Sequence, residues 1–165
     1  NPRDADDIYL DGGDGIARSR DAGKTWKHLV TPAMRVAYPD HLYCSPDEND
    51  VVYVAGGGTP PNIWRATGDA RSAFAVSRDG GYTWSQMTGG LPEEMPGNME
   101  AVTMATWPGG FGFIAGTSDG EVYASFDKGV HWSRLAEAIP PISKCIHHRN
   151  IQMGRAAVAQ AARQQ

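Results

Sequence analysis

The apolar positions of this chain form short runs that glycines interrupt at regular intervals. The runs are three or four residues long and are rich in β-branched and aromatic side chains, as at 8–10, 51–54 and 113–115. Such runs favour β-strands, and the neighbouring glycine clusters favour turns. Before residue 150 no segment repeats apolar residues at the helical period over three turns. The pattern therefore predicts a protein made of many short strands.

A pattern of eight residues occurs three times, at 19–26, 77–84 and 125–132. Ser, Asp, Gly and Trp occupy its first, third, fifth and eighth places in every copy. The closing tryptophans of successive copies are 58 and 48 residues apart. Repeats of this length are typical of propeller blades and solenoids.

Each repeat is predicted to hold four antiparallel strands, ordered outward from a propeller axis. The innermost strand falls within Arg35–Cys44 in the second repeat and within Met99–Thr106 in the third. The apolar runs are the second strands, while the third strands end at the Ser of the octapeptide and the fourth begin at its Trp. The first repeat has no innermost strand. Ile142–His147 has the composition of one, and we expect it to complete the first blade.

Three blades are too few for a closed ring, because propellers have about 4 to 8. We expect either a fragment of a larger propeller, which the absence of an initial Met favours, or half of a ring made by two copies. The predicted fold class is thus an all-β propeller of four-stranded antiparallel blades. It spans residues 1–150, and 151–165 form a C-terminal helix or tail.

The octapeptide has the chemistry of a tight turn. A carboxylate at its third place accepts backbone N–H bonds, a glycine at its fifth place supplies a positive φ, and the tryptophan anchors the hairpin. We therefore predict structural roles for Asp21, Gly23, Trp26, Asp79, Gly81, Trp84, Asp127, Gly129 and Trp132.

The octapeptide resembles the Asp-box, or BNR repeat, of sialidase-like β-propellers, and the chain resembles the C-terminal half of such a propeller. The third copy departs from the pattern, with His131 where Thr is usual. The resemblance implies a fold and leaves function open, because such propellers include glycoside hydrolases, assembly factors and sorting receptors. A sialidase would also need an arginine in a Phe/Tyr-Arg-Ile-Pro segment, which is absent. Arg18, Arg20 and Arg78 lie in or beside the turns, where we expect the outer rim.

Composition and charge limit the classes of partner that we expect. The 165 residues carry a net charge of −4 and no stripe of Lys and Arg, so no nucleic-acid surface is expected. No apolar run is long enough to cross a bilayer, and no signal peptide is visible. We expect a soluble protein, cytoplasmic or secreted after processing. Cys44 and Cys145 are expected to be free thiols.

Polar residues gather on the three segments assigned to innermost strands, which line the channel of a propeller. Buried charges are costly unless they are paired, so this density needs an explanation. One interpretation is a site at the channel mouth, with His41, Glu100 and His147 as catalytic residues. Substrate would be bound by Arg35, Tyr38, Lys144, His148, Arg149 and Trp64. The other interpretation is an ordinary channel lined by paired charges, with no cofactor; a divalent metal at the channel is a minor alternative.

An insertion at 59–72, which contains Trp64, separates the second and third strands of the second repeat. Its length is typical of a functional loop, although Trp64 tucked against the blade would explain it equally well. Two functions follow. The first is hydrolysis of a glycan or small polar substrate at the channel mouth, and the alternative is a non-catalytic binding or assembly propeller. Either needs the remainder of the ring, or a second copy, as partner.

Overall fold

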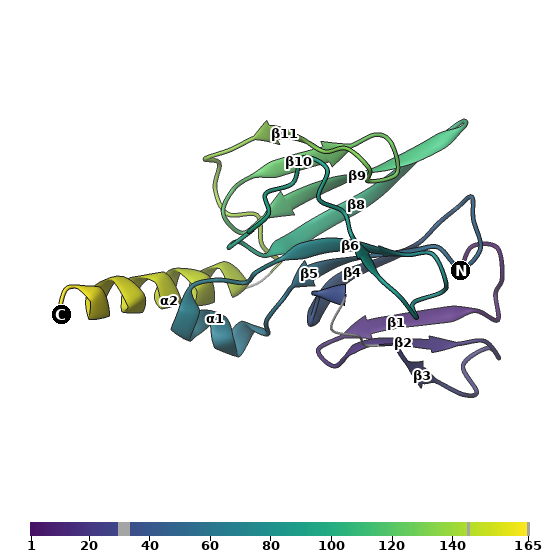
Figure 1. The fold of residues 1–165 in the computed structure, drawn as a ribbon, viewed down its shortest axis with the longest axis horizontal. Coiled ribbons are helices and arrows are strands. Elements are labelled where there is room, and N and C mark those ends of the chain that lie inside the picture. Colours follow the sequence, from purple (N-terminus) through teal and green to yellow (C-terminus); the bar gives the residue numbers. More distant parts are fainter. Residues whose placement is uncertain (30–33, 145, 165) are drawn as a thin grey trace.

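A computed structural model describes residues 1–29, 34–144 and 146–164. The chain forms three twisted antiparallel sheets that stack face to face, with two helices at one end (Figure 1). The first sheet has the order β1 (Ile8–Gly12), β2 (Gly15–Ser19), β3 (Lys27–His28). The second has the order β4 (Tyr38–Cys44), β5 (Val52–Gly57), β6 (Ala73–Ser77), β7 (Ser85–Gln86). The third consists of β8 (Met99–Trp107), β9 (Gly110–Thr117), β10 (Val122–Ser125) and β11 (Ser133–Ala136).

These sheets confirm the predicted blades. The third strand of each ends at the serine that opens the octapeptide, and the fourth strand begins one residue after its tryptophan. The first sheet, blade 1, has three strands and no innermost one, as predicted. The second and third sheets, blades 2 and 3, have four strands each.

The prediction of an innermost strand at Ile142–His147 was wrong. The described residues of this segment form no strand, and His147 instead begins α2 (His147–Ala162). Tertiary contacts override the local β-branched pattern. The backbone N–H of Ile142 bonds to the Thr117 carbonyl, and that of Lys144 bonds to the Glu100 carboxylate. The segment therefore does not complete blade 1. Cys145 lies outside the described residues, and Cys44 is a half-buried free thiol.

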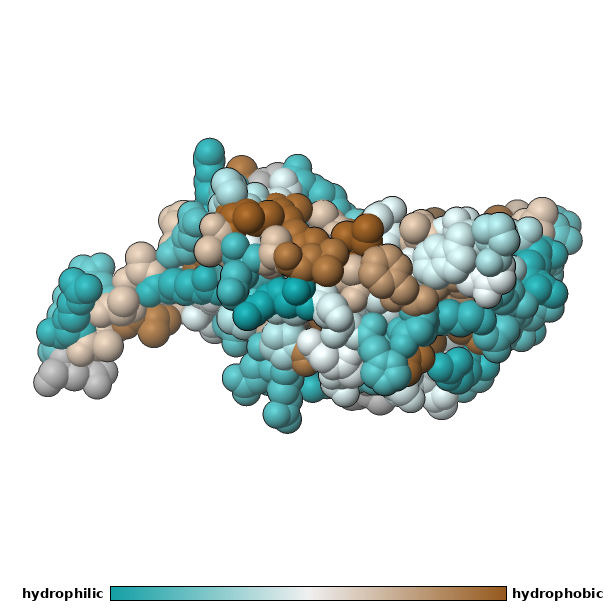
Figure 2. Space-filling view, turned by 90° about the horizontal axis from the view of Figure 1, so that it is seen from above, coloured by the Kyte–Doolittle hydropathy of each residue, from teal (hydrophilic) through white to brown (hydrophobic). Residues whose placement is uncertain are grey.

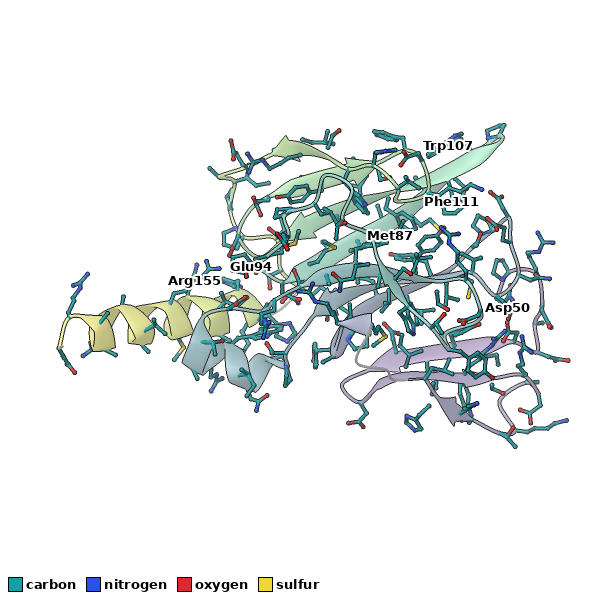
Figure 3. All side chains as sticks on the ribbon, viewed as in Figure 1. Asp50, Met87, Glu94, Trp107, Phe111 and Arg155 are labelled. Atoms are coloured by element: carbon teal, nitrogen blue, oxygen red, sulfur yellow. The ribbon has the colours of Figure 1, made fainter. Side chains whose placement is uncertain are left out.

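Adjacent blades pack through aromatic side chains. Phe113 of blade 3 meets Tyr53 and Phe74 of blade 2, with ring centroids 4.9 and 5.0 Å apart. Phe111 and Met87 point into the same interface, and Figure 3 shows them between the two sheets. A second cluster joins blades 1 and 2 and includes Ile16, Val52, Val54 and Trp84. Burial of these faces is the main force that holds the blades in order.

A buried arginine also joins blades 1 and 2. Arg18, which we predicted at the outer rim, is 5% exposed, and its guanidinium makes bonds of 2.6 and 2.9 Å to the carboxylate of Asp7. It also donates to Asp50 and to the carbonyl of Gly80, both in blade 2. The prediction failed because β2 turns this side chain toward the next blade, where complete pairing offsets the cost of burying its charge.

The three octapeptide turns share one hydrogen-bond pattern. In blade 2, Asp79 accepts the backbone N–H and the hydroxyl of Thr83, at 2.8 and 2.6 Å. In blade 3, Nδ1 of His131 stands where that hydroxyl would be, 2.6 Å from Oδ2 of Asp127. Each closing tryptophan donates its indole N–H to the glycine carbonyl three residues before it. The octapeptide thus forms the same hydrogen-bonded turn in every copy.

The fourth place of each turn shows a feature that the sequence did not reveal. Ala22, Gly80 and Lys128 all have positive φ, of 56°, 76° and 62°. Their N–H groups bond to the carbonyls of Asp6, Asp50 and Phe111, which lie two residues before equivalent positions of the second strand. This bond holds the turn against its own blade, and it costs strain at the two non-glycine residues.

The insertion of blade 2 folds into α1 (Pro61–Thr67), which packs against the first half of α2. Trp64 is fully buried between them, and Ile151 of α2 is 1% exposed. Beyond this contact α2 extends away from the sheets (Figure 1). Within the described ranges, neither helix has the length and apolar character needed to cross a membrane.

The outer face of blade 3 is apolar and uncovered. Strand register makes Ile114 the equivalent of Tyr53 in blade 2, because each is paired with the residue before the octapeptide serine. Tyr53 is 1% exposed under blade 3, whereas Ile114 is 39% exposed. Exposed Leu135 and Phe126 belong to the same blade, and Figure 2 shows an apolar patch on this side of the molecule.

Candidate functional site

The predicted site residues gather where β4 and β8 begin and α2 starts. Glu100, the second residue of β8, is fully buried, and its Oε1 lies 2.7 Å from Nδ1 of His147. Nδ1 of His147 makes no hydrogen bond within the described residues, and the contact is an ion pair only when the ring is protonated. Two of the three predicted catalytic residues therefore meet directly.

Other groups occupy the remaining positions around the Glu100 carboxylate. Its Oε2 accepts the Ser143 hydroxyl at 2.6 Å and the backbone N–H of Lys144 at 3.0 Å. Its Oε1 also accepts the amide of Asn98 at 3.3 Å. A buried carboxylate is tolerated only with such partners. Both oxygens are thus engaged by the protein itself.

Asn98 connects Glu100 with a second acid. The fully buried Asn98 amide also donates to Oδ2 of Asp40 at 2.7 Å, while Lys144 donates to the Asp40 carbonyl at 3.0 Å. Burial raises the pKa of the Asp40 carboxyl, and the Asn98 hydrogen bond opposes this rise. These contacts tie the start of β4 to the start of β8 through one polar network.

His41 belongs to this junction but does not touch the Glu100 carboxylate. Its Nε2 lies 2.8 Å from the carbonyl oxygen of Glu100 and 3.2 Å from the backbone nitrogen of Val102. One tautomer donates to the carbonyl and the other accepts the N–H. Burial lowers the pKa of His41, which favours the neutral ring that is needed to accept the Val102 N–H. The imidazole thus bridges the inner strands of blades 2 and 3.

The predicted substrate-binding residues separate into two groups. Tyr38 and Trp64 meet the His147 ring edge-on, at centroid distances of 5.9 and 5.2 Å, and Lys144 contacts Asp40. Trp64 is fully buried, so it packs the insertion against α2. His148 is half-buried and Arg149 is exposed, both on α2.

Arg35 lies apart from this network. It donates to the Gln86 side chain at 3.0 Å and lines a separate cavity of about 410 Å³ beside α1. The other residues around this cavity are Thr59, Ile63, Thr67, Asp69, Arg71, Ser72, Glu93, Glu94 and Met95.

Sequence reasoning missed Asn98 and Ser143 as members of the network. Neither stands in a motif, and only the fold brings residues 40, 98, 100 and 143 together. The described residues hold no group of three or more His, Cys, Asp or Glu side chains arranged for a metal ion. The contacts described above form a chain of hydrogen bonds from Asp40 through Asn98 to Glu100 and Ser143.

Comparison with known proteins identifies the repeat. A family model described as BNR/Asp-box repeat matches residues 75–86, which span the octapeptide of blade 2. No curated protein sequence matches the chain. The family match agrees with the repeated turn geometry seen in all three blades.

Solved structures share the fold. A structure described as "YCF48 bound to D1 peptide" is 21% identical over 83% of this chain, with a TM-score of 0.52. YCF48 from Cyanidioschyzon merolae is 21% identical over 81% of it, with a TM-score of 0.53. An ancestral GH74 enzyme is 14% identical over 87% of it, with a TM-score of 0.60.

This chain spans less than two fifths of each of these structures: 38% and 37% of the YCF48 chains and 18% of the GH74 enzyme. At these identities the likeness establishes the fold. The chain is thus a partial β-propeller built from Asp-box blades.

Proposed function

We propose that this partial Asp-box β-propeller is a non-catalytic module that binds a segment of a partner polypeptide. The observation that carries the proposal is the state of Glu100, whose side chain is fully buried and whose two oxygens are both engaged by residues of the chain. A general acid or nucleophile must reach a substrate atom.

The second acid of the network supports the same conclusion. A two-carboxylate glycosidase needs its acids on either side of a space that admits the sugar. Asp40 and Glu100 instead share the amide of Asn98, with bonds of 2.7 and 3.3 Å. The alternative interpretation made from the sequence, a channel lined by paired charges, fits this arrangement.

Partner binding also fits the comparison. The YCF48 structure is described as bound to a D1 peptide, so this fold holds a polypeptide segment in at least one protein. A fold carries no function by itself, and the likeness serves here as support from analogy. The remainder of a ring, or a second copy, remains part of the proposal because three blades leave the channel open.

Hydrolysis of a glycan is the second candidate, and one contact favours it. Glu100 and His147 are 2.7 Å apart, which is close enough for proton transfer once the ring turns to align its N–H with the carboxylate. If a ring partner drew α2 away from β8, this pair would be exposed. The candidate therefore predicts an activity that depends on Glu100.

The two functions are separated by assaying the same protein in two ways. The chain and its E100Q variant are tested for binding to an array of peptides of unrelated sequence. Both proteins are also tested for hydrolysis of a panel of aryl glycosides and β-glucans. We expect saturable peptide binding that E100Q retains, and no hydrolysis above a blank. Hydrolysis that E100Q abolishes, or the absence of binding to every peptide, would overturn the proposal.

A further inference from the structure

The cavity beside α1 exists because blade 2 carries an insertion that the other blades lack. In blades 1 and 3 short turns join the second strand to the third, whereas in blade 2 residues 58–72 and α1 lie between β5 and β6. The cavity volume of about 410 Å³ falls within the range of ligand sites in proteins.

The walls of this cavity are held rigidly. Trp64 donates its indole N–H to the Thr59 carbonyl at 2.8 Å, which closes the insertion on itself. Arg155 of α2 donates to the Gly68 carbonyl at 3.0 Å and pairs with Asp119 of blade 3 at 2.8 Å. The insertion is thus fixed to both the helix and the next blade, as a preformed site requires.

Two arginines of the cavity wall share a backbone constraint. Arg35 and Arg71 have φ of 55° and 51°, a region that costs a non-glycine residue free energy. Between them, Gly58 donates to the carbonyls of Ala70 and Arg71, and a Cβ on Gly58 would lie 2.6 Å from the Arg71 carbonyl oxygen. The fold therefore brings both arginines to one rim of the cavity at the expense of backbone strain.

Carboxylates complete the rim. Glu93 and Glu94 come from the loop between β7 and β8, and backbone bonds of 2.9 Å (Ser72 to Met95) and 2.8 Å (Ala70 to Pro96) hold this loop against the insertion. Glu94 lies at the helical end of the molecule in Figure 3. In the part of the chain that the structure describes, neither glutamate forms an ion pair with Arg35 or Arg71. Charges of both signs thus surround the cavity without neutralising each other.

We propose that this cavity binds a polypeptide segment that carries an acidic and a basic side chain close together. Its acid would be bound by Arg35 and Arg71, and its base by Glu93 and Glu94. This inference rests on the proposed partner-binding function and assigns it a surface. A purely anionic ligand would be repelled by the two glutamates, and a purely cationic ligand would be repelled by the two arginines. A ligand with both signs satisfies both sides.

The test uses an array of blocked hexapeptides in a Gly/Ser background. One set carries one Glu and one Lys separated by zero to three residues, and the reference sets carry two Glu, two Lys or neither. We expect the mixed set to bind best. The best peptide is then labelled and titrated against the protein by fluorescence anisotropy.

Variants locate the binding surface. R71E and the double variant E93K/E94K are expected to weaken binding by roughly tenfold or more. R78E makes the same charge change as R71E, and D14K makes half the charge change of E93K/E94K, both at exposed positions outside the cavity. Both are expected to change the affinity less than about twofold. A peptide with its Glu replaced by Lys should bind R71E better than it binds the unaltered protein. This reversal requires folded protein and distinguishes a direct contact from structural damage.

The outcomes separate the two proposals. If R71E and E93K/E94K bind as R78E and D14K do, or if peptides of a single charge sign bind best, the cavity assignment is overturned while peptide binding stands. If peptides of unrelated sequence bind but no mixed peptide does, the assignment also fails. Absence of binding to every peptide of both arrays removes the proposed function together with it.

Discussion

Glu100 and His147 face each other across the junction of β8 and α2, with Oε1 and Nδ1 2.7 Å apart and the carboxylate fully buried. The contact joins the innermost strand of blade 3 to the first residue of the C-terminal helix. The Glu100 carboxylate also accepts hydrogen bonds from Asn98, Ser143 and the Lys144 backbone, so it is the centre of the polar network. It is therefore the acceptor that three groups of this junction share.

Replacing Glu100 by Gln should destabilise the protein by about 1–3 kcal/mol, because the buried acceptors lose charge and one oxygen becomes a donor facing donors. The free energy of unfolding in urea measures this loss. E137Q, at an exposed position of the same blade, should stay within about 0.5 kcal/mol of the unaltered protein.

A double-mutant cycle with H147Q separates the pair from its surroundings. Direct contact predicts a coupling of about 0.5–3 kcal/mol between positions 100 and 147. Strictly additive losses would show that the two side chains act independently.

Acid should weaken the third octapeptide turn within a defined pH range. Hydrogen bonds from the His131 backbone and ring hold the pKa of Asp127 at about 2, below its ordinary value of 3.8. A lowered folded-state pKa stabilises the fold above the unfolded value, and this contribution is lost as the pH falls from about 4 toward 2.

Carboxyl NMR of Asp127 should show a midpoint near pH 2 in the folded protein. D127N should remove this part of the pH dependence of unfolding, whereas D14N, in an exposed turn of blade 1, should leave it unchanged. A midpoint near 4 for Asp127 would contradict the hydrogen-bonded geometry.

Gly80 should tolerate a side chain much less well than Gly109. Both have a positive φ, of 76° and 86°, so alanine is strained to a similar extent at either position. A Cβ at Gly80 would lie 1.8 Å from the Arg18 guanidinium, whereas nothing lies within 4 Å of one at Gly109. We expect G80A to cost about 1–3 kcal/mol more than G109A in urea unfolding. Equal losses would mean that Arg18 moves aside freely.

Gly154 should reverse the usual preference of helices for alanine. Alanine normally stabilises a helix interior over glycine by about 0.5–1 kcal/mol. Here a Cβ would lie 2.0 Å from the Trp64 carbonyl oxygen and 2.3 Å from the Gly68 nitrogen. G154A should therefore separate α2 from α1 and accelerate amide hydrogen exchange in 147–155.

The comparison for Gly154 is Q160A, a substitution on the exposed part of the same helix. It should leave hydrogen exchange in 147–155 unchanged. Slower exchange in G154A than in the unaltered protein would show that α2 is not seated against the insertion as described.

The octapeptide made the blades predictable because its chemistry is local. Its serine and tryptophan mark the end of one strand and the start of the next, and the structure places both boundaries within one residue of the prediction. The same reasoning failed at Ile142–His147, whose apolar residues suit a strand as well as a helix start. There the decision is made by contacts with Trp64 and Thr117, which are distant in sequence.

The candidate site could be predicted only in part, because it too depends on contacts between residues that are distant in sequence. Glu100 and His147 were recognisable as polar residues on supposed inner strands. Asn98, which joins Glu100 to Asp40, has no local signature, and the positive φ of Ala22 and Lys128 is hidden by their side chains. Chemistry that depends on distant contacts cannot be read from spacing.

The equivalence of Ile114 and Tyr53 has a consequence for how the molecule unfolds. Among the described residues, the main contacts between blades join blade 1 to blade 2 and blade 2 to blade 3. The fold therefore behaves as a linear array whose stability is a sum of blade and nearest-neighbour terms. Blade 2, covered on both faces, is the interior unit, while blades 1 and 3 are ends that fray. Unfolding of this chain should therefore begin in the two end blades and reach the strands of blade 2 last.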